Sequence, residues 1–341
     1  MSMEAIAEKP IDELMRPYNL MRHQQSVNGS VGIVAMPKGG VDPVHILRCF
    51  NLALQNAGAS DIGNWPAFYP DIGRIADYRQ WTESELRTAF DRGGFDLHYQ
   101  PQTGLFNGEI VGYEALIRRK YPERGMIPTV EFIPIAEETG MIGSIGERVL
   151  RKVCNDAAYL PDQCFVAVNI WPVQSITKDF VGLVNEVVRS TGLKPQRLEL
   201  EITEPALMQD KGRATSILKQ LTQAGFSIAV DAFGTGYSKL SYLIDVSFHK
   251  LKIDWSFMDR IDQNESSGAV VSTIVGLSRA LGVHAIAEGF ETEAQARLLQ
   301  AAGCEVMQGS LCGHPAPLKI GNGHVVPVHG KDKYPQAEHA Y

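Results

Sequence analysis

The chain has no apolar run as long as the roughly 18 residues that cross a membrane, and its N-terminus lacks a signal-peptide pattern. Its five cysteines form no CxxC pair and have no histidines at zinc-ligand spacing, which favours reduced thiols over disulfides or structural zinc. A formal net charge of −7 argues against binding of nucleic acid polymers. We therefore expect a cytoplasmic protein with no membrane segment in this chain.

What remains is an ordinary globular composition, with 44% hydrophobic and 21% charged residues. A length of 341 residues accommodates one α/β barrel of roughly 250 residues and a smaller piece. Residues 1–78 are predicted to be that smaller α/β piece, which is thin for an independent core. Its predicted elements are a helix over 5–20, a strand over 29–36, a helix over 43–57 and a strand over 66–71.

Residues 95–317 alternate short apolar runs with amphipathic helical patterns, several of which end at a glycine. Such alternation predicts an α/β fold, specifically a TIM-like (β/α)8 barrel. The open doubly wound sheet is the alternative, and no GxGxxG loop supports it. Residues 79–94 are interpreted as a solvated linker helix and 318–341 as a loose polar tail. The candidate strands are 95–100, 110–117, 165–170, 198–203, 226–230, 250–253, 285–287 and 305–307.

Polar residues stand where these apolar runs end, most visibly at Asp231, which is followed by the glycine turn Gly234-Thr-Gly236. In a barrel such positions converge on the rim at the carboxyl ends of the strands. Carboxylate and amide oxygens suit Mg²⁺ or Mn²⁺, and the absence of histidine from the set disfavours zinc. Structural caps and ion pairs are the alternative for each position taken singly. The set is Glu114, Asn169, Glu201, Asp231, Lys252, Glu288 and Gln308.

The motifs in this region resemble those of EAL domains, the cyclic di-GMP phosphodiesterase family. They are LHYQP (97–101), EALIR (114–118), FIPIAEETGMI (132–142), ELEITE (199–204), FGTGYSKLSYL (233–243), LKIDWSF (251–257), AEGFET (287–292) and QGS (308–310). Residues 1–78 resemble the C-terminal half of a GGDEF (diguanylate cyclase) domain, truncated and degenerate, through Ser30-Val-Gly-Ile-Val34. The resemblance implies metal-dependent hydrolysis of cyclic di-GMP to linear pGpG.

The resemblance also implies a role for each matching residue. Two metal ions would be bound by Glu114, Asn169, Glu201, Asp231 and Glu288. Lys252 would contact the attacking water, Gln308 would help to position it, and Glu204 would steady the glycine loop after Asp231. From the residues alone, Lys252 could equally be a general base or neutralise charge. Arg118 would hold a phosphate, while Gln100, Leu116 and Pro134 would line the ligand, and a homodimer through the EAL domain is a family expectation.

Three residues depart from the family pattern. Ala232 stands where DDFGTG has its second aspartate, so the second metal loses a ligand and hydrolysis is expected to be impaired more than binding. Trp171 replaces a usual serine, and Ser310 replaces a usual aromatic residue. The alternative function is therefore a catalytically inactive cyclic di-GMP receptor. A third hypothesis is a protein-binding scaffold with an empty site. Loss of the ligand-binding residues would be expected in that case, whereas Arg118 is present.

Overall fold

The computed structural model describes residues 18–20, 23–25, 83–84 and 86–326, apart from 122–124, 128, 173–178, 235–242, 244, 259–260, 262–264 and 322–323. The chain divides into two compact units, Met1–Glu85 and Leu86–Tyr341. In the first unit, strands β1 (Tyr18–Leu20) and β2 (His23–Gln25) pair in antiparallel fashion. The helix predicted over 5–20 is therefore wrong at its last three residues, since Pro17 favours a helix end there. The other elements predicted for 1–78 lie outside the described residues.

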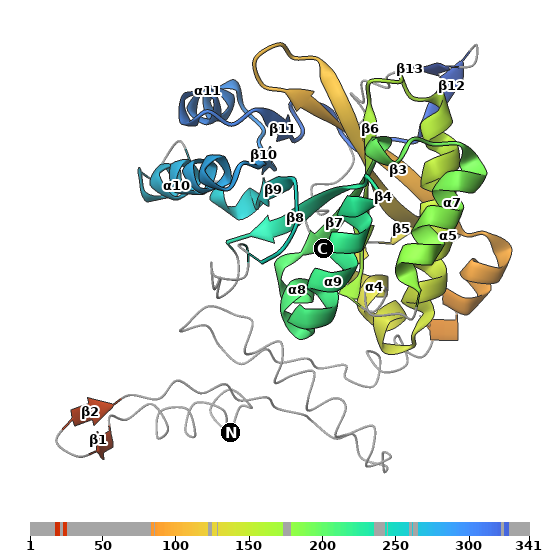
Figure 1. Cartoon of the computed structure of the whole chain (residues 1–341), viewed down its shortest axis with the longest axis horizontal. Helices are drawn as coiled ribbons and strands as arrows, with labels where there is room; N and C mark the ends of the chain where they lie inside the picture. Colours follow the sequence, from red (N-terminus) through yellow and green to blue (C-terminus); the bar gives the residue numbers. More distant parts are fainter. Residues whose placement is uncertain are drawn as a thin grey trace, which may run out of the picture. The chain divides into compact units, whose positions relative to one another are not determined.

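The second unit contains a closed β-barrel surrounded by helices (Figure 1). Neighbouring strands follow the order β3-β11-β10-β9-β8-β7-β6-β4, and β3 also pairs with β4, which closes the ring. The predicted barrel is confirmed, with β6, β7 and β9 at the predicted positions. The strands are β3 (Phe95–Gly104), β4 (Ile110–Tyr121), β6 (Phe165–Ile170), β7 (Leu198–Thr203), β8 (Ser227–Phe233), β9 (Lys250–Ile253), β10 (His284–Glu288) and β11 (Val306–Gln308), with β5 (Gly125–Ile127) paired to the end of β4.

Strand β3 runs antiparallel to both of its neighbours, β4 and β11, whereas the other barrel strands are parallel. Only residues 105–109 separate β3 from β4, which is enough for a hairpin and too short for a parallel crossover. The barrel therefore departs from a uniform (β/α)8 repeat at its first strand. Closure of the ring makes the first strand, β3, a direct neighbour of the last, β11.

The helices form the outer layer and follow most of the strands (Figure 1). Their apolar faces cover the barrel, so the strands are buried on both faces, as expected for parallel sheets. Gly225, Gly282 and Gly303 end helical segments with φ angles of +92°, +72° and +81°, confirming their predicted capping role. The helices are α4 (Thr129–Glu138), α5 (Met141–Asp156), α7 (Phe180–Thr191), α8 (Glu204–Gln209), α9 (Lys211–Gln223), α10 (Glu265–Leu281) and α11 (Glu293–Ala302).

Two flanking segments differ from the sequence-based expectation of a solvated linker and a loose tail. Residues 86–92 are helical, and Leu86 is fully buried in the hydrophobic core of the barrel unit. After the barrel, β12 (Lys319–Gly321) and β13 (His324–Val326) form an antiparallel pair. The Asn-Gly sequence between them and the β-branched valines of β13 favour a hairpin locally. The linker helix thus contributes to the barrel's packing, and part of the tail has regular structure.

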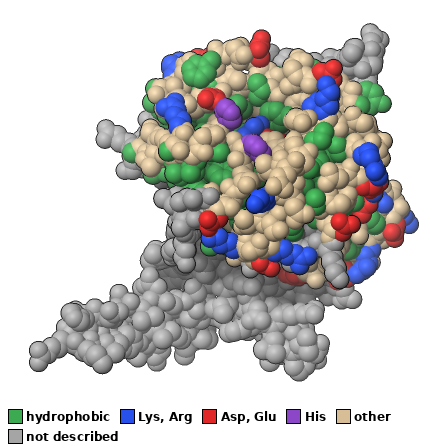
Figure 2. Space-filling view, in the orientation of Figure 1, with side chains coloured by type: hydrophobic (Ala, Val, Ile, Leu, Met, Phe, Trp, Pro, Cys, Tyr) green, Lys and Arg blue, Asp and Glu red, His purple; other side chains and the backbone are tan. Residues whose placement is uncertain are grey.

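Acidic and basic side chains are interspersed on the face shown in Figure 2, so this face carries no large patch of one charge. In the described part of the chain, none of the helices has the length and apolar character needed to traverse a bilayer.

The burial of Leu86 leads to a stability prediction. Leu86→Ala should lower the free energy of unfolding by about 2–5 kcal/mol, because it removes a packed side chain from a core that cannot fully collapse. Urea denaturation of the full chain followed by circular dichroism measures the change. Arg92→Ala is the control on the exposed face of the same helix and should change it by less than about 0.5 kcal/mol. An equally small effect of Leu86→Ala would mean that the helix is only a connector.

Candidate active site

The site is centred on Lys252, whose side chain on β9 is fully buried inside the barrel. Four carboxylates from four other strands surround its ammonium group. The distances from Lys252 Nζ are 2.6 Å to Glu201 Oε2, 2.7 Å to Glu288 Oε1, 3.3 Å to Glu114 Oε2 and 3.5 Å to Asp231 Oδ1. Strand ends that are far apart in the sequence thus bring these predicted residues together at one end of the barrel.

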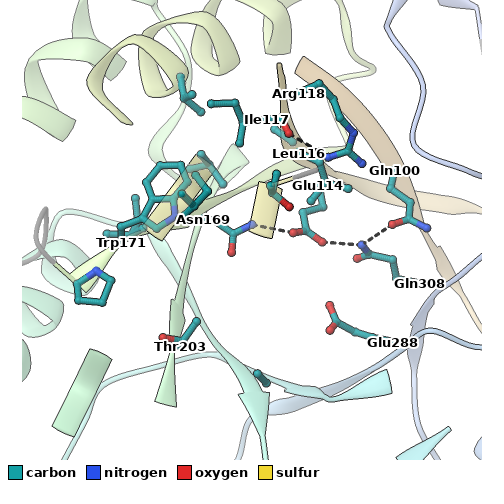
Figure 3. Close-up of a pocket in the computed structure, with 18 of the residues that line it drawn as sticks. Gln100, Glu114, Leu116, Ile117, Arg118, Asn169, Trp171, Thr203, Glu288 and Gln308 are labelled. Carbon is teal, nitrogen blue, oxygen red and sulfur yellow. Dashed lines mark hydrogen bonds between the residues drawn. The ribbon is translucent and has the colours of Figure 1, made fainter. Parts of the chain in front are cut away.

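Glu114 is the most extensively bonded of the four carboxylates. Asn169 Nδ2 donates to its Oε1 at 2.8 Å, and Gln308 Nε2 donates to its Oε2 at 2.5 Å. Gln308 Nε2 also donates to Gln100 Oε1 at 3.1 Å, so these amides form a continuous network around the carboxylate (Figure 3). Four predicted residues that are far apart in the sequence therefore meet in one bonded cluster.

One ammonium group is not enough to neutralise the four buried carboxylates around it. Burial alone would lower the pKa of Lys252, but Asp231 and the other carboxylates raise it well above its usual value, so the ammonium stays charged. At Glu114, burial would raise the pKa, but Lys252 and the hydrogen bonds from Gln308 and Asn169 outweigh it, so the pKa is lowered. Burial and then neighbouring carboxylates raise the pKa of Glu201 well above its usual value, and burial raises that of Glu288 to about 8. A charged Lys252 is a charge-neutralising donor rather than a general base.

The donor set fits a hard divalent cation. Buried oxygens Glu201 Oε1 and Asp231 Oδ2 have no hydrogen-bond partner among the described residues, and burying a carboxylate oxygen without a partner is costly. Carboxylate and amide oxygens are the ligands that Mg²⁺ and Mn²⁺ prefer. Among the described residues, no three acidic side chains are arranged to bind one metal ion together. The ammonium group of Lys252 lies between the carboxylates instead.

Strand β8 is irregular at the key motif. Its pairing with β9 shifts register between Val230 and Phe233, which places Asp231 and Ala232 in a bulge of the kind that re-aims side chains at active sites. Ala232 has a φ angle of +52°, a left-handed backbone that aspartate and asparagine adopt more readily than alanine does. Ala232 N donates to Asp231 Oδ1 at 2.8 Å. The backbone at this position thus suits the aspartate of the family motif better than the alanine present.

A cavity of ≈ 400 Å³ opens beside this cluster. All four residues predicted to line a ligand, Gln100, Leu116, Arg118 and Pro134, belong to its wall. Glu114, Asn169, Glu288 and Gln308 also reach it, whereas Glu201, Asp231 and Lys252 lie deeper and do not line it. Figure 3 shows Arg118 and Gln100 on one side of this cavity and Trp171 on another.

Glu204 occupies a separate position, at the start of α8. Its Oε2 accepts a hydrogen bond of 3.5 Å from Gly234 N, at the beginning of the glycine turn after Asp231. This placement suits the predicted steadying role, and residues 235–242 of that loop lie outside the described part.

Several wall and network residues were not predicted as site residues. Trp255 follows β9 and lines the cavity together with Trp171. Gln102 is fully buried and bonded to Gln308, yet only its two-residue spacing from Gln100 on β3 could have indicated that it faces the same side. Thr203, Ile133 and Glu137 also line the cavity.

Residues 83–315 match the EAL domain family, and because this match covers more than half of the chain, the protein belongs to that family. An uncharacterized signaling protein of Caulobacter vibrioides is 38% identical over 313 residues, covering 92% of this chain and 39% of the relative. The bifunctional diguanylate cyclase/cyclic di-GMP phosphodiesterase MucR of Pseudomonas aeruginosa is 35% identical over 318 residues, covering 92% of this chain and 46% of MucR.

Solved structures give the same family. The PaMucR phosphodiesterase in complex with c-di-GMP matches with 39% identity and a TM-score of 0.66, over 70% of this chain and 98% of that one. The EAL enzyme Bd1971 in a cGMP-bound form matches with 32% identity and a TM-score of 0.69, over 72% and 69% of the two chains. The present chain spans about two fifths of the length of the first curated relatives.

The raised pKa of Glu288 leads to a pH prediction. Its folded-state pKa of about 8 lies above the ordinary 4.5, so the metal-free fold is most stable with respect to this group below about pH 4.5 and loses that stability as the pH rises to about 8. A divalent cation competes with that proton. The rise in melting temperature caused by Mn²⁺ should therefore be larger at about pH 8 than at about pH 6. Differential scanning fluorimetry measures it, with Glu288→Gln as the control that flattens the dependence. An equal rise at both pH values would contradict the assignment.

The left-handed backbone of Ala232 leads to a second prediction. Ala232→Gly should raise the free energy of unfolding by about 0.5–1 kcal/mol, because the relief of a left-handed alanine exceeds the larger unfolded-state entropy of glycine. Chemical denaturation with a chelator present isolates this backbone effect from metal binding. Ala229→Gly is the matched control on β8, where the φ angle is not positive, and it should be destabilising. Loss of stability in both variants would contradict the strain at Ala232.

Proposed function

We propose that this chain binds cyclic di-GMP in the cavity and hydrolyses one phosphodiester bond to give linear pGpG, in a reaction that depends on Mg²⁺ or Mn²⁺. The observation that carries the proposal is the convergence of four carboxylates, Asn169 and Lys252 in one cluster that reaches, through Glu114, Asn169 and Glu288, a cavity whose wall holds Arg118. Hydrolysis adds water across the bond: a new P–O bond forms, the P–O3′ bond breaks, and the leaving 3′ oxygen takes up a proton.

The residues divide this chemistry among them. Two divalent ions held by Glu114, Asn169, Glu201, Asp231 and Glu288 would supply Lewis acidity and activate the attacking water. Lys252 keeps its charge at the centre of the carboxylate cluster, where its N–H groups would contact the attacking water. Gln308 donates to Glu114 and to Gln100 Oε1, and so holds the Glu114 carboxylate in one orientation.

The cavity wall suits a nucleotide with phosphates and aromatic bases. Arg118 provides a guanidinium group with donors matched to phosphate oxygens. Trp171 and Trp255 provide indole surfaces in the same wall, and stacking on such rings is worth about 1–3 kcal/mol per base. Similarity to the PaMucR phosphodiesterase, whose structure holds c-di-GMP, supports this ligand for the present chain.

Ala232 is proposed to impair the reaction rather than abolish binding. It lines the cavity, and its methyl group offers no oxygen where the family motif has a carboxylate. The second ion is then held by fewer oxygens, and the two-metal clamp on the reacting phosphate is weakened.

The organisation of the whole chain is a further part of the proposal. We assign 1–78 to a degenerate GGDEF-like half, 79–94 to a linker helix, 95–317 to the EAL domain and 318–341 to a C-terminal tail. Support for the first assignment is that the alignment with bifunctional MucR covers 92% of the chain, which extends beyond the EAL match at 83–315. A cytoplasmic location and a homodimer through the EAL domain stay predictions from the family.

Cyclic di-GMP turnover tests the function. In single-turnover assays with Mg²⁺ or Mn²⁺, the chain should release pGpG, and Ala232→Asp should raise the rate at least about tenfold, the lower end of what loss of a supporting metal partner costs. Binding in Ca²⁺, followed by quenching of Trp171 and Trp255 fluorescence, should change little between the two forms. Glu201→Gln is the inactive control.

The outcomes separate the candidates. Equal rates for the two forms would show that Ala232 is not the limiting defect. Binding without turnover in both forms would leave a cyclic di-GMP receptor. Absence of binding with or without metal would overturn both functions.

A further inference from the structure

Gln102 lies on β3 at the closure of the barrel and has no role in the function described so far. Its side chain is fully buried, and it shares the inner face of the strand with Gln100, two residues earlier. Strand β3 stands between β11 and β4, where Gln102 is the cross-strand partner of Gln308 and Gln100 is that of Glu114. The two glutamines of this antiparallel strand therefore face the two residues that form the carboxylate–amide contact of the site.

The hydrogen bonds form a chain in one direction. Gln102 Nε2 donates to Gln308 Oε1 at 2.8 Å, and Gln308 Nε2 in turn donates to Glu114 Oε2 at 2.5 Å. Gln102 Oε1 has no hydrogen-bond partner among the described residues. Within that part of the chain, the buried amide of Gln102 is thus bonded through its nitrogen to Gln308.

The direction of this chain follows from the carboxylate. An ionised carboxylate only accepts hydrogen bonds, so Gln308 must turn its NH₂ group toward Glu114 and its Oε1 away. In a site with Gln308 only 5% exposed, that oxygen needs a donor, and Gln102 supplies it. Without the donor, a buried carbonyl oxygen would be unsatisfied at a cost of about 1–3 kcal/mol. The opposite orientation of Gln308, which turns an oxygen toward Glu114, would then be less strongly disfavoured.

The backbone beside Gln102 is also irregular. The pairing of β3 with β4 shifts between Gln102, which faces Gly112, and Thr103, which faces Ile110. Such bulges re-aim side chains near active sites. Because Gly112 has no side chain, nothing from β4 projects across from Gln102 at this level.

We propose that Gln102 is a positioning residue: it fixes the orientation of the Gln308 amide and, through it, the Glu114 carboxylate that binds the divalent cation. This role rests on the proposed function only in taking Glu114 as a metal ligand. The new element is that strand β3, which closes the barrel, controls the orientation of the Glu114 carboxylate.

Mn²⁺ affinity tests the role without relying on turnover. Gln102→Met keeps the length of the side chain and removes the donor, and it should weaken Mn²⁺ binding about tenfold in titration calorimetry on the full chain, as expected for a residue that orients a metal ligand. Because Gln102 acts through Gln308, the same substitution in a Gln308→Met background should cause no further loss. Turnover of cyclic di-GMP should fall in parallel in the single variants.

A matched control separates positioning from loss of stability. Thr103→Val, on the next residue of β3, removes a buried hydroxyl that lies 2.7 Å from Cys312 Sγ and should lower the melting temperature while leaving Mn²⁺ affinity unchanged. Unchanged affinity in Gln102→Met, or additive losses in the double variant, would overturn the role of Gln102 alone. A wild-type chain that does not bind Mn²⁺ would overturn both this role and the proposed metal dependence.

Discussion

The structure depends on the contact between one buried ammonium group and four buried carboxylates. A charge removed from water is costly unless opposite charges and hydrogen bonds replace its hydration. Lys252 has such partners on every side, and Glu114 has amide donors on both of its oxygens. Because the carboxylates outnumber the ammonium, the raised pKa values of Glu201 and Glu288 favour protons on these groups when no metal is bound. A divalent cation can take the place of those protons, which makes this end of the barrel receptive to it.

The barrel is what makes this concentration of charge achievable. Each parallel strand ends at the same rim, so one residue per strand is enough to assemble the set, while helices outside the barrel keep water from its outer face. The register is strict: Glu201 lies beside Asn169, and Glu288 beside Gln308. A shift by one residue on any strand would turn its functional side chain to the other face. Among the described strand pairings, register shifts lie at Gln102 and at Asp231-Ala232, both in the site.

Much of this arrangement could be predicted from the sequence. Short apolar runs located β6 and β8, as expected for strands buried on both faces. Alternation of apolar with charged residues located β7 and β9, whose inward charged residues Glu201 and Lys252 belong to the site. The direction of β3 was not predicted, although the gap of 101–109 between the two candidate strands is too short for a parallel crossover and indicates a hairpin. Leu86 and Gln102 were missed because their burial depends on distant segments. A lone leucine or glutamine gives no local sign of what will cover it.

Strand β3 has a consequence for how the chain folds. The barrel closes only when β3, near residue 100, pairs with β11, near residue 308, so the contacts that complete the site are among the most distant in the sequence of this unit. Pairings of such long range are formed slowly, because the loop entropy must be lost before the contacts compensate for it. During synthesis, β3 leaves the ribosome about 200 residues before β11, and until then the edge of β3 that pairs with β11 stays unpaired. The site can therefore be completed only after nearly the whole barrel has been synthesised.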